Sequence, residues 1–196
     1  MSETEFLIGR SGLDLQDDFY PDDMPSEWRF DYYSAMFKAL SLPIDTDEDL
    51  DTIFEDMQDA EEFELVLSIE QVQLIDVKQL ASLLSGVADH QADFTLFCVV
   101  DQVLGQSVID LLDGYRFCFQ SPSSLGLDLS ESKIRGQYLA FNQIPVMYSD
   151  KVWDEKKMRS YLEDASAINT KTVLICKFAE SSALDKIRII SELLGY

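Results

Sequence analysis

The sequence predicts a single α/β domain, residues 1–196, in which a parallel sheet is covered by outer helices. Strand-like apolar runs alternate along the chain with helical patterns, an order that places parallel strands beneath helices. The run FTLFCVV (94–100) is apolar at successive positions, as in strands that are buried on both faces. A chain of 196 residues with 46% apolar content suits one domain with a full core. These observations leave two arrangements of the sheet open, a closed barrel and an open sheet.

Seven segments are predicted to be strands because they are short, apolar and bounded by polar or turn-forming residues. Pro43 weakens the second of them, since proline cannot donate a hydrogen bond to a neighbouring strand. The predicted strands cover residues 6–9, 40–44, 63–69, 94–100, 115–119, 138–141 and 172–178. Residues 121–137 are rich in serine and glycine and are predicted to form a loop.

Helical spacing predicts six helices between these strands. In the first, Ser26 is a suitable N-cap, and Trp28, Tyr32, Ala35, Met36 and Ala39 follow helical spacing. The second is acidic and begins with Asp45 or Thr46 as its cap. The predicted helices cover residues 25–40, 45–57, 77–87, 107–112, 154–165 and 183–194. No strand is followed by a glycine-rich phosphate-binding motif, so nucleotide-binding open sheets find no support.

The charge of the chain is strongly negative, −22 in total, and it is unevenly distributed. Residues 1–70 contain 21 acidic and 3 basic residues, a net charge of −18, whereas residues 71–196 carry the remaining −4. Such a field repels phosphate, so we expect no binding to nucleic acid or to anionic membranes. Two interpretations of the acidic part stay open: a solvated face that confers solubility, and a docking face for a basic protein partner.

Three linked motifs near the start of the chain resemble a known family. They are IGRSG (8–12), FYPDDMPSEW (19–28) and DYYSAMF (31–37). In order and spacing they are similar to the opening of the YecE-like family, domain of unknown function 72. FQSPSS (119–124), YLAFNQ (138–143) and the closing strand and helix resemble later parts of that family. The resemblance implies a TIM-type barrel over nearly the whole chain.

The departures from that family lie at the strand ends, where active sites of such barrels are found. Arg10 stands where the family has threonine, Ser41 and Pro43 where it has a Glu-x-Asn motif, and Ser68 where it has lysine. The family also has a strand with flanking helices where this chain has only residues 125–137. We therefore expect a TIM-barrel-like parallel sheet that lacks one βα unit and has about seven strands, with a degenerate site.

No motif for catalysis or metal binding stands out. Cys98, Cys118 and Cys176 lie within strands and are expected to be buried, without zinc or a disulfide. The acidic run 45–56 lacks the glycine and the final glutamate of a calcium-binding loop. The single histidine, His90, has no evident catalytic partner and is expected in an exposed loop. We expect no metal and no cofactor.

Two hypotheses about function follow, from different classes. The first is a non-catalytic binding or interaction protein that takes an unknown small molecule or protein partner. The alternative is an enzyme with a rebuilt site at the mouth of the barrel, acting on an unknown substrate. The polar residues that are candidates to line a pocket there are Arg10, Ser11, Tyr20, Asp101, Gln120, Ser121, Asn142 and Lys177. The N-terminus lacks the features of a secretory signal, which predicts a cytoplasmic protein.

Overall fold

The structure of the protein is a computed structural model, which describes residues 4–16, 19–60, 62–151 and 154–196. Nine strands in this part of the chain belong to one sheet. They are β1 (Glu5–Ser11), β2 (Ala39–Pro43), β3 (Glu64–Ser68), β4 (Phe94–Val99), β5 (Arg116–Ser121), β6 (Ser130–Ile134), β7 (Gln137–Phe141), β8 (Val146–Ser149) and β9 (Lys171–Cys176). The α-helices are α1 (Arg29–Met36), α2 (Leu50–Met57), α3 (Gln71–Ile75), α4 (Val77–Gly86), α5 (Gln106–Leu111), α6 (Glu155–Ser166) and α7 (Ser181–Leu194).

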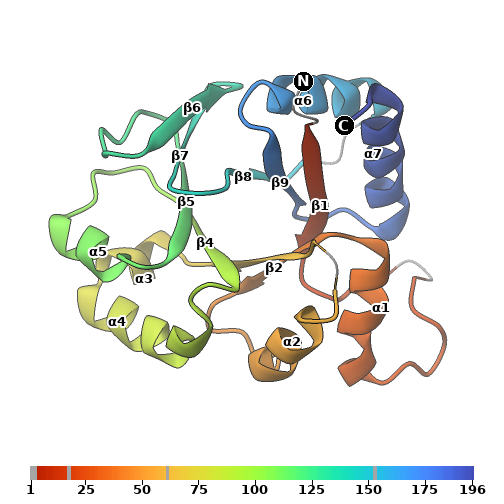
Figure 1. The fold of residues 1–196 in the computed structure, drawn as a ribbon, viewed down its shortest axis with the longest axis horizontal. Helices are drawn as coiled ribbons and strands as arrows, with labels where there is room; N and C mark the ends of the chain where they lie inside the picture. The colour runs from red at the N-terminus through yellow and green to blue at the C-terminus, as the bar shows by residue number, and fades with distance from the viewer. Residues whose placement is uncertain (1–3, 17–18, 61, 152–153) are drawn as a thin grey trace.

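The sheet is curled and open, a half-barrel with helices on its outer side (Figure 1). Its strand order is β6-β7-β5-β4-β3-β2-β1-β9-β8. Neighbours from β8 through β5 run parallel, whereas β7 is antiparallel to both β5 and β6. The predicted α/β class with outer helices is confirmed. The finer prediction, a TIM-type barrel with about seven parallel strands, is wrong, because the sheet is mixed, has nine strands and does not close.

The antiparallel part of the sheet explains this difference. The connection after β5 is too short for a helical crossover, so the chain returns as a hairpin of β6 and β7. Arg135 and Gly136 form its two-residue turn, with φ values of 49° and 82°. Positive φ at both central residues is typical of the turn that suits hairpin twist. Residues 121–137 were predicted to be a loop from their serine and glycine content, and an arginine in the first turn position gave no strong hairpin signal against that prediction.

Side chains bridge the gap where the parallel strands fail to close into a barrel. The Val146 N–H of β8 donates to the Sγ atom of Cys118 in β5 at 3.3 Å. The Tyr148 N–H donates to the Oε1 atom of Gln120 at 3.3 Å. These two bonds stand where a strand-to-strand ladder would lie. They satisfy buried backbone donors of β8 without a further strand.

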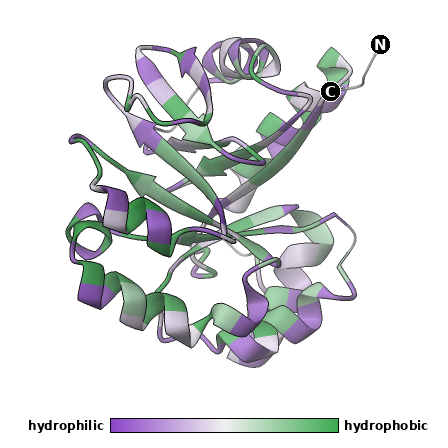
Figure 2. Cartoon of the chain, turned by 60° about the vertical axis from the view of Figure 1, so that its left-hand side comes forward, coloured by the Kyte–Doolittle hydropathy of each residue, from purple (hydrophilic) through white to green (hydrophobic). Residues whose placement is uncertain are grey.

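The core lies between the sheet and its helices and also fills the inside of the curl. Figure 2 shows mostly green strands and helices that carry purple segments, the pattern of elements buried on their inner side. Leu40, Leu65, Phe94 and Leu174 are fully buried on four different strands. Among the described residues, no helix combines the length and the apolar character that a membrane span requires.

Helix α2 shows how the acidic run is used. It begins later than predicted, because Asp49 is its N-cap and accepts a hydrogen bond from the Thr52 N–H at 3.3 Å. Hydrogen bonds from Thr52 lower the pKa of the Asp49 carboxyl. The carboxylate also sits favourably at the positive end of the helix dipole. The acidic residues around Asp49 therefore form the N-terminus of α2.

Helix α1 has apolar residues on two faces. Phe30, Tyr33 and Phe37 are buried against the sheet. Trp28 and Met36, whose spacing predicted the helix, are instead 61% and 44% exposed. The spacing identified a helix correctly, but its members from Trp28 to Met36 face outward, and the last member, Ala39, lies beyond the helix in β2 and is buried. The buried face is made by residues that lie between the members of that series.

Tyr33 joins three elements through its hydroxyl group. The Tyr33 Oη accepts the Arg10 N–H of β1 at 3.0 Å and donates to the Ala39 carbonyl of β2 at 2.8 Å. Its side chain is completely buried, and burial raises the pKa of this phenol well above its usual range. The hydroxyl therefore acts as a neutral donor and acceptor that links α1 to both strands.

Replacing Tyr33 by phenylalanine should leave the Arg10 N–H and the Ala39 carbonyl buried without partners. We expect a loss of about 2–3 kcal/mol in the free energy of unfolding, since each unsatisfied buried group costs about 1–3 kcal/mol. Urea unfolding followed by circular dichroism measures this loss. Tyr138→Phe is the matched control, because its hydroxyl has no hydrogen-bond partner in the described part of the chain, and it should change stability little. Equal effects of both substitutions would contradict the role of Tyr33.

Candidate functional site

The carboxyl ends of the parallel strands surround a cavity of about 510 Å³. Parallel strands end at one edge of a sheet, and this edge is the usual place for a ligand in such folds. The volume is within the range of small-molecule sites. Its lining residues come from β1, β2, β3, β4, β8 and the segments that follow β2, β3 and β9: Ser11, Ser41, Pro43, Asp45, Ser68, Ile69, Glu70, Gln71, Gln73, Phe97, Val99, Tyr148 and Lys177. We call this space the mouth cavity.

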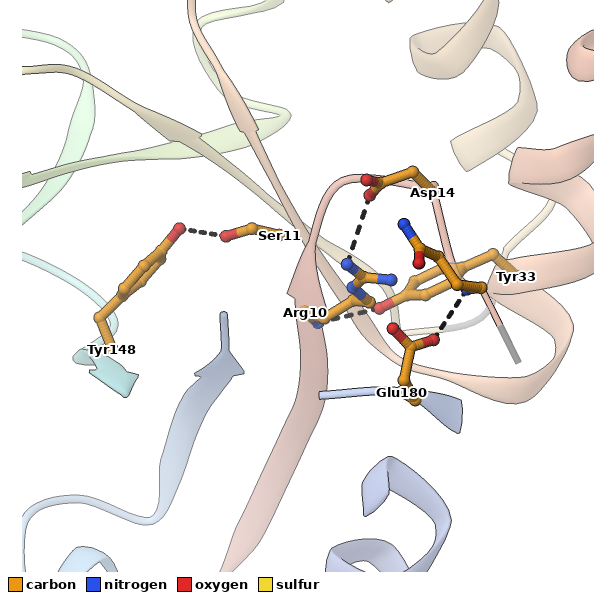
Figure 3. Close-up of polar contacts among 7 residues, drawn as sticks. Arg10, Ser11, Asp14, Tyr33, Tyr148 and Glu180 are labelled. Carbon is orange, nitrogen blue, oxygen red and sulfur yellow. Dashed lines mark hydrogen bonds and ion pairs between the residues drawn. The ribbon is translucent and has the colours of Figure 1, made fainter. Parts of the chain in front are cut away.

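Hydroxyl groups form the centre of the mouth cavity. Ser11 and Ser41 are partners in the register of β1 and β2, so their side chains lie side by side. The Tyr148 Oη is hydrogen-bonded to the Ser11 Oγ, and it donates to the Ser41 Oγ at 3.5 Å. The ring of Tyr148 stacks on Phe97 with centroids 4.9 Å apart. Tyr148 thus reaches from β8 across to β1 and β2 and closes the inside of the open curl, as Figure 3 shows for its bond to Ser11.

Charged groups lie on opposite sides of these hydroxyls. Lys177 follows β9, on one side of β1, whereas Asp45 and Glu70 follow β2 and β3, on the other side. Within the described ranges Lys177 forms no ion pair, and its ammonium lies 5.2 Å from the ring centroid of Phe178. The wall of the cavity therefore has a positive end and a negative end, separated by serine hydroxyls.

Amide side chains hold the negative end in place. The Gln73 Nε2 donates to the Asp45 Oδ2 at 2.8 Å, and the Gln73 Oε1 accepts the Glu70 N–H at 2.9 Å. One glutamine thus links the segments that follow β2 and β3. Ser68 donates to the Leu42 carbonyl at 3.3 Å, which leaves its oxygen as an acceptor toward the cavity.

A second cavity of about 340 Å³ lies beside the first, at the gap between β5 and β8. Gln120 lines it from β5, Arg135 from the hairpin turn and Tyr161 from α6. Tyr148 contributes to both cavities. The second cavity occupies the place where the sheet lacks a closing strand.

The structure brings some of the eight candidate residues to these cavities. Ser11 and Lys177 line the mouth cavity, and Gln120 lines the neighbouring one. Asp101 is not a lining residue of the mouth cavity, but it contacts one. Its carboxylate accepts a hydrogen bond from the Nε2 of Gln71, a lining residue, at 2.7 Å, and its N–H donates to the Gln71 Oε1 at 2.7 Å.

Two of the other four candidates lie on the outer side of β1. Arg10 points away from the mouth, because neighbouring residues of a strand face opposite sides and Ser11 points inward. Its guanidinium is buried and contacts the Asp14 carboxylate at 3.3 Å (Figure 3). Tyr20 lies with the Arg29 guanidinium over its ring, 5.3 Å from the centroid. Burial raises the pKa of Tyr20 above its usual range.

The remaining two candidates bond to backbone groups at the two ends of β5. The Asn142 side chain accepts the Phe117 N–H at 2.9 Å and donates to the Tyr115 carbonyl at 2.8 Å, at the end of β5 opposite the mouth. Ser121 donates to the Ser123 carbonyl just after β5. Both side chains satisfy backbone groups and do not line the mouth cavity.

Sequence reasoning did not select the residue at the centre of the cavity, Tyr148. No strand was predicted over β8, so nothing indicated that this tyrosine would face inward. Ser41 and Ser68 were noted as replacements within the resemblance, but serine alone carries no pattern. The two-residue alternation along β1 was the available signal, since it excludes Arg10 and Ser11 from sharing one side of the sheet.

The cysteines are buried and free of disulfides. Burial raises the pKa of the Cys98, Cys118 and Cys176 thiols to about 12, so each stays protonated near neutral pH. In the described residues, no group of three or more His, Cys, Asp or Glu side chains is arranged to hold a metal ion. His90 is half-buried and stacks on Phe54 at 4.1 Å between ring centroids.

Comparison with known proteins places the fold. No family model matches the sequence, and no curated protein matches it. A solved structure does: a DUF72 family protein from Thermotoga maritima, with a TM-score of 0.60 over 97% of this chain and 99% of that chain. The chain has a DUF72 fold. The identity is 11%, so the match concerns the fold. The predicted relationship to this family is thereby confirmed at the level of the fold.

Proposed function

We propose that this DUF72-fold chain is a binding protein whose mouth cavity holds a small zwitterion of amino-acid size. The observation that carries the proposal is the charge arrangement of the cavity. Lys177 offers an ammonium group to a carboxylate, and Asp45 and Glu70 offer carboxylates to an amine on the other side of the serine hydroxyls. A ligand that bears both charges satisfies both ends at once, whereas a simple anion or cation satisfies one.

The chemistry of the described side chains supports binding over catalysis. Acid–base or nucleophilic catalysis uses groups with displaced pKa values beside the substrate. The groups whose pKa values are raised by burial, such as Tyr33, Glu64 and Cys98, do not line the mouth cavity. An experiment can distinguish the enzyme alternative, because an enzyme would convert the bound molecule to a product.

Calorimetric titration with L-serine, L-glutamine and L-glutamate tests the proposal. We expect at least one of these zwitterions to bind, and Lys177→Met to weaken its affinity about 10- to 100-fold. This range corresponds to the 1.5–3 kcal/mol of a hydrogen bond to a charged group. Lys78→Met is the matched control, since Lys78 lies on α4 away from the cavity, and it should leave the affinity unchanged.

Asp45→Asn tests the contact with the amine of the ligand separately from the contact with its carboxylate. Asparagine keeps an oxygen for the Gln73 amide but removes the charge. The substitution should therefore weaken the binding of amino acids and leave the binding of L-lactate, which has no amine, unaffected. Binding of glucose with no response to any amino acid would contradict the proposal, as would equal losses in the Lys177 and Lys78 variants. Consumption of the bound amino acid, followed by NMR, would favour the enzyme alternative.

A further inference from the structure

The outward face of α1, together with the 3-10 turn (Ser26–Trp28) that leads into it, carries an apolar stripe that nothing in the described chain covers. Trp28, Tyr32 and Met36 are 61%, 38% and 44% exposed and recur at four-residue intervals. This spacing places them along one side of the helix. We call them the α1 stripe. A surface helix normally keeps its apolar residues on the buried side. Here the buried apolar side is already formed by Phe30, Tyr33 and Phe37. The α1 stripe is therefore a second apolar surface, which packing against the sheet does not explain.

Contacts beneath the stripe hold it in place. The Tyr32 ring meets Phe19 edge-on with centroids 5.2 Å apart, and Phe19 stacks on the buried Phe37 at 5.6 Å. Tyr32, at the middle of the stripe, is thus connected to the core through rings. A fixed aromatic surface loses little conformational entropy when a partner binds.

Carboxylates flank the α1 stripe on the same helix and on its neighbour. Glu27 and Asp31 directly precede Trp28 and Tyr32, and both are exposed. Helix α2 lies against α1, and burial, together with the charges of Asp31, Glu55 and Asp59, raises the pKa of the Asp56 carboxyl on α2. Within the described residues, Glu27, Asp31 and Asp56 form no ion pair.

Two of the three basic residues in positions 1–70 are engaged with other groups. Arg10 is bound to Asp14, and the Arg29 guanidinium lies over the ring of Tyr20. Like charges gathered without cations raise the free energy of the isolated surface, and a cationic partner would lower it. An aromatic centre within a charged rim is also the usual composition of a protein interface.

We propose that the α1 stripe and its flanking carboxylates dock a basic amphipathic segment of a partner protein. Such a segment would place aliphatic side chains on Trp28 and Met36 and its lysine or arginine side chains on Glu27, Asp31 and Asp56. A second copy of this chain would bring the same carboxylates and a net charge of −22, which opposes self-association. Anionic membranes and nucleic acids are opposed by the same field. This surface is independent of the mouth cavity.

A synthetic 14-residue helical peptide of leucine and lysine, with leucine along one face, is the probe. We expect calorimetry to show binding that weakens as salt rises, since exposed charges are screened beyond about 8 Å at physiological ionic strength. Trp28→Ala combined with Met36→Ala should reduce the affinity at least tenfold. Glu27→Gln combined with Asp31→Asn should also reduce it and flatten the salt dependence.

Matched controls distinguish this docking from nonspecific attraction. Leu193→Ala removes an apolar side chain that is 81% exposed on α7, and Asp128→Asn removes an acid outside the N-terminal face. Both should leave the affinity unchanged, and a scrambled peptide of the same composition should bind at least tenfold more weakly.

The proposal is overturned if the scrambled peptide binds equally well or the controls weaken binding as much as the stripe variants. It is also overturned if sedimentation shows a dimer that Trp28→Ala dissociates. Circular dichroism confirms that each variant is folded, and amino-acid binding at the mouth cavity should be unaffected by the stripe variants.

Discussion

Replacing Arg116 by methionine should reduce the free energy of unfolding by about 3–5 kcal/mol at neutral pH, the usual cost of leaving one member of a buried ion pair alone. Arg116 in β5 contacts both carboxylate oxygens of Glu64 in β3, at 3.1 and 3.2 Å. Thr95 in β4 donates to the same carboxylate at 2.7 Å. Glu64 is 6% exposed, so without Arg116 its charge would have little access to water.

The loss in this variant should depend on pH. Burial raises the pKa of Glu64 above its ordinary value, although Arg116 counteracts part of the effect. A carboxyl whose pKa is higher in the folded than in the unfolded chain adds stability below its unfolded pKa, and this stability is lost as pH rises through its folded pKa. Without Arg116 the folded pKa should rise further. The deficit of Arg116→Met relative to the unmodified protein should therefore shrink as the pH falls from 7 toward 5.

Urea unfolding at several pH values measures both effects. Arg159→Met is the matched control, because Arg159 pairs with Glu163 on the exposed surface of α6. Surface pairs of this kind contribute about 0–1 kcal/mol. A deficit in Arg116→Met that stays constant from pH 5 to 7, or that is no larger than that of the control, would contradict the buried-pair interpretation.

Replacing Gly9 by alanine should prevent β1 and β2 from pairing as they do. A Cβ atom at Gly9 would lie 1.6 Å from the Ala39 carbonyl oxygen and 2.3 Å from the carbonyl carbon. Both are backbone atoms, so no side chain can move aside. Tyr33 donates to the same carbonyl, so a shift of β2 would also disturb the link to α1. We expect a loss of about 3 kcal/mol or more, at or above the usual range for overpacked cores.

Gly86→Ala is the control for this substitution. Gly86 is the last residue of α4, and an added Cβ there meets no atom within 4 Å. Alanine favours helices over glycine by about 1 kcal/mol, so the control should be neutral or slightly stabilising. Thermal unfolding separates the two variants, since 1 kcal/mol shifts the midpoint by about 2–4 °C for a chain of this size. A Gly9→Ala protein as stable as Gly86→Ala would show that β1 and β2 tolerate a wider separation.

The predicted strands coincide with observed strands wherever the chain is continuously apolar. The runs at 63–69, 94–100 and 172–178 became β3, β4 and β9. Strands β6 and β8 were not predicted, because β6 is polar and mostly exposed and β8 is only four residues long. Their conformation depends on pairing with β7 and β9, which no local pattern reports.

Of the eight candidate residues, Ser11 and Lys177 line the mouth cavity at the carboxyl ends of the strands, where the candidate pocket was expected. Ser11 and Lys177 follow from the position of strand ends along the chain, which a sequence contains. Tyr148 reaches its place by crossing the inside of the curl to residues more than 100 positions away. Asn142 occupies the opposite end, because β7 runs antiparallel and reverses the direction in which its last residues lie.

By itself, the sequence determined the α/β class, the buried cysteines and the acidic character of residues 1–70, because these depend on local periodicity, apolar content and charge. Only the tertiary structure decided that the sheet stays open, that Tyr148 joins Ser11 and Ser41, and that Trp28 faces outward. The physical reason is the same in each case. Which of two apolar faces is buried, and which edge strands meet, depends on contacts between distant segments, whose free energies arise only when the chain is folded.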